Sequence, residues 1–231
     1  MLAFVAGVVG TGLGGGIPAA ICGKRKTTVG WMTAFAAGVM VGLSLLDLLP
    51  EAIGAVLTPW IPVLGCLLGA LAVFLLDLRG GKSGKTGNLV SAGMVTAAAI
   101  AVHNVPEGMI LGATLAAGQP ENAWTLGVLI GLHNIPEGMA ISAPLLAGGK
   151  KRLTSAALAA ASGLPTVAGA LLGCFLGSLG DVWVSVLLAF AAGAMVFVSA
   201  YELYPNATEI CGKASAAFAA LAGIAVTVLI R

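Results

Sequence analysis

Hydrophobic positions along this chain form long, nearly uninterrupted runs, with polar residues confined to the short segments between them. Eight runs reach the length of about 20 residues that a helix needs to cross a bilayer. They lie at 2–22, 28–50, 56–78, 89–116, 122–148, 154–178, 182–206 and 213–230. This pattern predicts an all-α integral membrane protein with eight transmembrane helices, forming one domain over residues 1–231.

The composition agrees with this interpretation and excludes a soluble protein. Charged residues make up 9% of the chain and hydrophobic residues 59%, whereas a soluble domain carries about 25% charged residues. Such a chain cannot cover its surface against water, but lipid can solvate it. The net charge of +2 comes from the loops and indicates no nucleic-acid partner.

Lysine and arginine residues fall almost entirely on one side of the predicted membrane. The loops after the first, third, fifth and seventh spans hold ten of the eleven: Lys24, Arg25, Lys26, Arg79, Lys82, Lys85, Lys150, Lys151, Arg152 and Lys213. Cytoplasmic loops carry the excess of basic residues in membrane proteins. We therefore expect a multi-pass protein of the cell membrane with these loops in the cytoplasm and both termini outside.

Two internal repeats are visible in the sequence. Residues 34–52 and 189–207 agree at eleven of nineteen positions, and they lie in spans of opposite direction. The second repeat pairs HNVPEGM at 103–109 with HNIPEGM at 133–139 in adjacent, antiparallel spans. Similarity between oppositely directed helices predicts an inverted repeat, with spans 1–3 related to spans 6–8 and spans 4 and 5 at the centre.

Ionisable side chains inside the predicted spans mark the candidate chemistry. They are four carboxylates and both histidines of the chain: Asp47, Glu107, Glu137, Glu202, His103 and His133. Each charged acid near the bilayer centre costs about 2.5–3.5 kcal/mol on insertion scales. The predicted spans offer no lysine or arginine at that depth, so a metal ion or protons must neutralise these acids.

Helical geometry groups these side chains further. His103 and Glu107 are four residues apart, about 40° around a helix, and therefore share a face. Asn104 lies on the other side of Glu107, so that this carboxylate can share one ion with His103 and a second with Asn104. The next span repeats the arrangement with His133, Asn134 and Glu137. Two such helices face to face provide ligands for one or two ions.

The ligand types narrow the choice of ion. Imidazole combined with carboxylate favours Zn²⁺, Fe²⁺ or Mn²⁺ over Mg²⁺ and Ca²⁺, which prefer sites built only from oxygen. Asp47 and Glu202 are either acids at the ends of helices or residues that line the ion's path. Met40 and Met195 occupy matching repeat positions, where a thioether suits soft metals but also fills helix cores.

These residues resemble the ZIP (Zrt-, Irt-like) family of metal transporters over the whole chain, most specifically in HNVPEG and HNIPEG. The resemblance implies transport of zinc, and also of iron, manganese or cadmium, into the cytoplasm. By motif it assigns metal binding to His103, Asn104, Glu107, His133, Asn134 and Glu137. It also implies that a methionine of span 2, here Met40, approaches the metal.

The chain departs from the family pattern at two places. Many relatives have a glutamate in span 6 that helps to hold a second ion, and the corresponding residue here is Thr166, whose neutral hydroxyl is a weaker ligand. Many also have a histidine-rich loop between spans 3 and 4, where this chain has only RGGKSGKTGN at 79–88. The first departure weakens the expectation of a full second site.

The expected function is therefore transport of a divalent metal ion rather than enzymatic catalysis. An intramembrane metalloenzyme is the alternative, but it needs a spare general base and the HExxH pattern is absent. A metal sensor using the same ligands is a further alternative. The expected partners are the ion, the lipid bilayer and at most a second copy of the chain.

Overall fold

The computed structural model describes residues 1–21, 26–80, 89–176 and 180–230. Regular structure within these ranges is helical throughout, and η denotes a π-helical turn. In chain order the segments are α1 (Leu2–Phe4), η1 (Val5–Val9), α2 (Gly10–Ile21), α3 (Lys26–Leu43), η2 (Ser44–Leu48), α4 (Leu49–Gly54), α5 (Trp60–Gly80), α6 (Leu89–Ala116), α7 (Pro120–Ala147), α8 (Arg152–Ser162), α9 (Leu164–Leu176), α10 (Asp181–Val198), η4 (Ser199–Leu203), α11 (Tyr204–Cys211) and α12 (Lys213–Ile230).

The helical runs fall where the hydrophobic pattern predicts them. Within the described part of the chain, five are long and apolar enough to cross a membrane: Leu2–Ile21, Thr27–Gly54, Leu89–Ala116, Arg152–Phe175 and Asp181–Cys211. Two shorter apolar helices cover Trp60–Leu76 and Lys213–Leu229, and α7, with 28 residues, completes the set. The prediction of a helical membrane protein is confirmed. Four of the ten basic residues used to orient it lie outside the described residues: Lys24, Arg25, Lys82 and Lys85.

The outer surface of the bundle is apolar, as a lipid environment requires. Large hydrophobic side chains point outward from most helices, among them Leu71, Leu171, Phe175, Trp183 and Leu229. A soluble protein rarely exposes contiguous apolar patches larger than a few hundred Å². Lipid is as apolar as these side chains, so this surface suits a bilayer rather than water.

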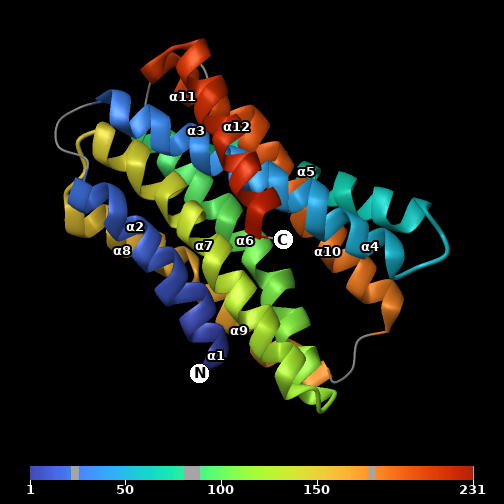
Figure 1. Cartoon of the computed structure of the whole chain (residues 1–231). Helices are drawn as coiled ribbons and strands as arrows, with labels where there is room; N and C mark the ends of the chain where they lie inside the picture. Colours follow the sequence, from blue (N-terminus) through green and yellow to red (C-terminus); the bar gives the residue numbers. More distant parts are fainter. Residues whose placement is uncertain (22–25, 81–88, 177–179, 231) are drawn as a thin grey trace.

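Helices α6 and α7 run antiparallel through the middle of the bundle (Figure 1). Helix α2 packs against α7, and α9 packs against α6. On the other side α3 contacts α7 and α10 contacts α6, while α12 covers α3 and α5 covers α10. The two helices that carry the HN-x-PEGM motifs are thereby enclosed by the remaining spans.

Glycines in these motifs set how closely the neighbouring helices approach. A Cβ on Gly138 would collide with the carbonyl oxygen of Thr11 in α2. In the same way, a Cβ on Gly108 would collide with the carbonyl oxygen of Thr166 in α9. Small residues at such crossings allow membrane helices to pack backbone against backbone. The residue after each motif glutamate is therefore fixed against a second helix.

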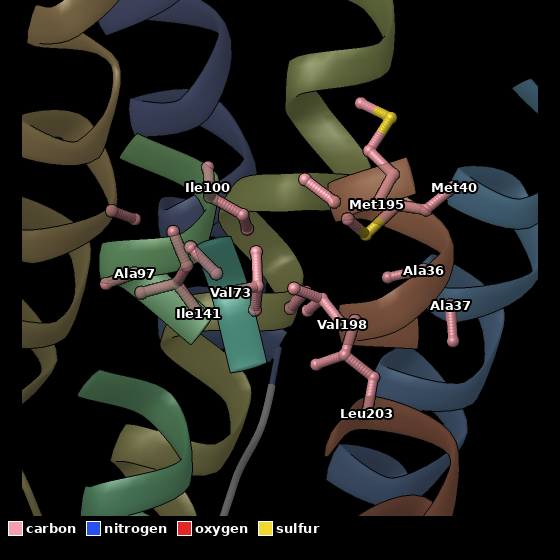
Figure 2. Close-up of a cluster of buried hydrophobic side chains, with 14 of the residues drawn as sticks. Ala36, Ala37, Met40, Val73, Ala97, Ile100, Ile141, Met195, Val198 and Leu203 are labelled. Carbon is pink, nitrogen blue, oxygen red and sulfur yellow. The ribbon is translucent and has the colours of Figure 1, made fainter. Parts of the chain in front are cut away.

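An apolar cluster fills the space between α3, α6, α7 and α10 (Figure 2). Its large members are almost fully buried and include Met40, Ile100, Ile141, Met195 and Val198. Ile100 precedes His103 by one turn and Ile141 follows Glu137 by one turn. Since α6 and α7 are antiparallel, both isoleucines lie on the same side of the motif residues. The cluster therefore closes that side of the bundle centre.

Candidate metal centre

The two motifs meet at the centre of the bundle, and their side chains pair between the helices. His103 Nε2 on α6 lies 2.9 Å from Glu137 Oε1 on α7. His133 Nε2 on α7 lies 3.1 Å from Glu107 Oε1 on α6. The helices continue without interruption through the proline of each motif. The expected clustering of these four residues is thus present, but each imidazole contacts the carboxylate of the opposite helix rather than that of its own.

Three of these residues come close enough together to hold a single ion. One ligand atom from each of His103, Glu107 and Glu137 lies within 4.8 Å of the others. All three residues are buried, with Glu107 the most accessible at 4% exposure. The His133 side chain is 10% exposed and joins the group through its contact with Glu107. Imidazole and carboxylate together form a suitable ligand set for zinc.

Several polar atoms of this cluster have no hydrogen-bond partner within the described part of the chain. They are Nδ1 of His103 and Oε2 of both glutamates. With Nε2 donating its proton to the carboxylate, Nδ1 of a neutral imidazole keeps a lone pair. Unpaired buried polar atoms are rare in proteins, and an ion is among the explanations for them. These atoms are therefore candidate ligands of an ion.

The two asparagines connect the motifs to the neighbouring spans. Asn104 Nδ2 donates to the carbonyl oxygen of Ser162 at 2.9 Å, and Asn134 Nδ2 donates to that of Ala6 at 2.8 Å. Ser162 ends α8, directly before the break at Gly163, and Ala6 lies in the π-helical turn η1. The Oδ1 atom of each asparagine is buried and finds no partner among the described residues. Each amide thus fixes a helix contact and keeps one oxygen available for an ion.

The structure places the other predicted residues in the elements that surround the two motifs. Met40 belongs to the apolar cluster of Figure 2, which also contains Ile100 of α6. Asp47 lies in η2 and Glu202 in η4, and neither joins the three-residue group. Thr166 is fully buried beside Gly7 and Gly108, and its hydroxyl has no partner within the described ranges.

Sequence reasoning missed the serines next to these residues. Ser44 Oγ donates to the Met40 carbonyl oxygen at 2.7 Å and lies 3.5 Å from Met195 Sδ. Ser199 is its equivalent in the other repeat copy and is also buried. The signal was available, because serine occupies the same position of both copies. The π-helical turns that begin at these serines could not be predicted from the hydrophobic pattern.

These observations first define a class of protein. The chain is a helical membrane protein with a buried group of imidazole and carboxylate ligands between its two central helices. Comparison with known proteins then identifies the family. Residues 79–231 match the family described as ZIP zinc transporter.

Individual relatives match over nearly the full chain. The zinc transporter ZupT of Corynebacterium glutamicum is 32% identical over 93% of this chain and 92% of its own length. ZupT of Chlorobium luteolum is 31% identical over 99% of this chain and 95% of its own length. The zinc transporter GufA of Myxococcus xanthus is 37% identical, but the match spans 54% of this chain and half of that relative. The chain belongs to the ZIP zinc transporter family.

Proposed function

We propose that this protein carries zinc across the membrane into the cytoplasm through a site formed by His103, Glu107, His133 and Glu137. Its family is one of zinc transporters, so its function is transport rather than catalysis. The observation that carries the assignment of the site is the buried His103, Glu107 and Glu137 group between two antiparallel helices. The oxygens of Asn104 and Asn134 are the further ligands we propose.

The chemistry of this group supports a transported ion of the zinc type. Two negative carboxylates at the centre of a bundle are costly in lipid unless a cation neutralises them. Iron, manganese and cadmium in their divalent forms accept the same ligands. Thr166 offers only a neutral hydroxyl, which is a weak metal ligand. This favours one tightly bound ion over two.

The arrangement of the helices supports the inverted repeat that we infer from the sequence. The turns η2 and η4 occupy the same position in the two repeat copies. The packing is matched as well, because α12 covers α3 just as α5 covers α10. Asn134 bonds to span 1 just as Asn104 bonds to span 6. Each half of the site thus has its counterpart in the other.

The orientation of the chain in the membrane is inferred from the positive-inside rule. The basic residues Lys150, Lys151 and Arg152 directly follow α7. The last turns of α7 contact the first turns of α3 through Val29 and Ala143, with Ile210 of α11 beside them. The described basic loops therefore gather at one end of the bundle, which we assign to the cytoplasm, with the termini on the opposite side.

Uptake into liposomes tests the proposal. Purified protein should admit Zn²⁺ down its gradient, as reported by a zinc-sensitive dye inside the vesicles. Uptake by the Glu137→Ala variant should be slower by more than about tenfold. Loss of a residue that only hydrogen-bonds a metal ligand already lowers metal affinity or activity by about 10–100-fold. The matched control is Glu121→Ala, which removes an exposed acid from the same helix. Uptake by the unmodified protein no faster than by protein-free liposomes would refute the transport function.

If Glu137→Ala transports as well as Glu121→Ala does, the function stands but the proposed site is wrong. Zinc binding to the detergent-purified variants provides an independent measurement. The Glu137→Ala variant should bind zinc more weakly than the control by a similar factor.

A further inference from the structure

A cavity of about 460 Å³ lies beside α10, between α5 and the turn η2. Pockets of about 300–1,000 Å³ between the helices of a bundle are common sites for small ligands. Helices α5 and α10 lie side by side (Figure 1). None of the proposed metal ligands lines this cavity. The walls come from η2 and α4 between Ser44 and Leu49, from α5 between Cys66 and Ala70, and from α10 and η4 between Ala192 and Tyr201.

Close contact between α5 and α10 fixes the width of this cavity. A Cβ on Gly69 would collide with the carbonyl oxygen of Phe190, and a Cβ on Gly193 would collide with that of Cys66. The two backbones therefore touch, as small residues allow in membrane helices. Because α5 is held against α10, it cannot move toward η2 without breaking this contact. The space between α5 and η2 thus follows from the packing of α5.

The walls of the cavity offer few polar groups to a ligand. The Ser44 hydroxyl already donates to the Met40 carbonyl oxygen at 2.7 Å. The Cys66 thiol interacts with the backbone of Gly193. A buried water makes about three hydrogen bonds to polar groups, and these walls do not supply them. The cavity therefore suits an apolar ligand.

The cavity opens onto the surface that faces lipid. Leu45, Leu67 and Tyr201 line it, and each is at least half exposed. Along α10 and η4 the cavity extends over nine residues, from Ala192 to Tyr201, which corresponds to about 14 Å in a helix. The hydrocarbon core of a bilayer is about 30 Å thick, so the cavity is as long as one leaflet is deep. These dimensions and the apolar walls fit one acyl chain of a membrane lipid.

Side chains fill the corresponding place in the other copy of the 34–52 sequence repeat. Tyr204 occupies the position of Leu49 in that copy. It packs against a cluster of buried alanines that joins α3, α11 and α12, and Phe35 packs against the same cluster. The second copy thus places an aromatic ring where the first copy has a smaller leucine beside a cavity.

We propose that this cavity is a specific site for one acyl chain of a phospholipid, distinct from the lipids that exchange freely around the bundle. The chain lies along α10 and contacts α5 on one side and η2 on the other. It thereby connects span 3 to span 2 in the region where the cavity separates them. The inference goes beyond the proposed transport function and does not depend on it.

Phenylalanine substitutions that fill the cavity test this site. Ala70 on α5 and Ala200 in η4 both line it, so Ala70→Phe and Ala200→Phe each place an aromatic ring where the acyl chain lies. The matched control is Ala157→Phe, which adds the same ring at an exposed position of α8, a helix that packs against α2 and α7. With two filling variants, a failure of one to fold leaves the other to test the site.

Thermal unfolding in detergent with added palmitoyl-oleoyl phosphatidylcholine measures the binding. A ligand at about a hundredfold its dissociation constant raises the Tm of a protein of this size by about 5–10 °C. We expect this rise for the unmodified protein and for Ala157→Phe. The rise should be less than half as large for Ala70→Phe and Ala200→Phe, because the ring occupies the site. An equal rise in the filled variants and the control would overturn the proposal.

The same lipid with a diazirine in its palmitoyl chain locates the chain by photolabelling in liposomes. In Ala157→Phe, the cavity segments 66–70 and 192–201 should be labelled more strongly than Leu171 and Phe175, which are exposed on α9. Ala70→Phe and Ala200→Phe should reduce the labelling of the cavity segments severalfold and leave that of α9 unchanged. Equal labelling of the two regions in the control, or cavity labelling that neither filled variant reduces, refutes the site. Neither measurement involves zinc, so this failure is separate from a failure of the proposed transport function.

Discussion

The Gly138→Ala substitution tests whether the metal centre depends on the close packing of α7 against α2. A Cβ at this position meets the Thr11 carbonyl oxygen, and it approaches the Gly15 nitrogen to 2.7 Å and the Thr11 carbonyl carbon to 2.8 Å. All three are backbone atoms of one helix and cannot rotate aside. Ordinary van der Waals contact begins at 3.4 Å. The helices must therefore separate by at least several tenths of an ångström.

This separation has two consequences. Overpacking in a dense interior costs about 1–3 kcal/mol, which corresponds to about 2–12 °C in Tm for a protein of this size. Glu137 is the next residue along the chain, and its Oε1 lies 2.9 Å from His103 Nε2. A shift of α7 moves this carboxylate relative to α6, and small displacements of positioned groups have large effects on a site. We expect weaker zinc binding as well as a lower Tm.

Thermal unfolding in detergent and zinc titration against a competing dye measure the two effects. Gly131→Ala is the matched control because it lies on the same face of α7 seven residues earlier. Its Cβ meets only the Ala6 Cα, at 3.6 Å, and this variant should keep both the Tm and the zinc affinity of the unmodified protein. If Gly138→Ala unfolds and binds zinc as Gly131→Ala does, the close approach of α2 does not position the site.

Three further predictions concern the site itself. In liposome uptake, Asp47→Ala should retain more transport than Glu107→Ala, because Asp47 lies outside the three-residue group; equal losses would extend the site to η2. Zinc affinity, measured by calorimetry, should be highest at a pH above the ordinary histidine pKa of about 6.5 and should fall at lower pH, since the ligands bind metal only when deprotonated. An affinity that is unchanged between about pH 7.5 and 5.5 would contradict ligation by imidazole. Asn134→Ala removes the hydrogen bond from the Asn134 amide to the Ala6 carbonyl oxygen and should lower the free energy of unfolding by about 0.5–1.5 kcal/mol, whereas an unchanged Tm would contradict a stabilising role for this bond.

Much of the architecture could be predicted because a bilayer restricts the choices. The eight hydrophobic runs correspond to eight helical runs, since only helices satisfy the backbone of such a chain in lipid. The repeated motifs also indicated that spans 4 and 5 share a site. Both predictions use features that are local in the sequence, namely the length of a run and the position of a polar residue within it.

The pairing within the site could not be predicted in the same way. Spacing places His103 and Glu107 on one face of α6, but the rotation of α6 and α7 about their axes decides which groups touch. In the structure His103 contacts Glu137, and His133 contacts Glu107. The backbone partners of the asparagines depend on where spans 1 and 6 break. That information is in the packing of four helices and not in any one of them.

The crossed pairs have a consequence for how tightly an ion is held. Each carboxylate already has one oxygen on an imidazole, so an ion must use the remaining oxygens and Nδ1 of His103 or separate the pairs. Any pair that is broken reduces the net gain from zinc binding, because a buried charged hydrogen bond is worth about 1.5–3 kcal/mol. A carrier must bind an ion well enough to admit it and weakly enough to release it. The self-pairing of the ligands therefore suits transport, and it also leaves each carboxylate with a hydrogen-bond partner when the ion has left.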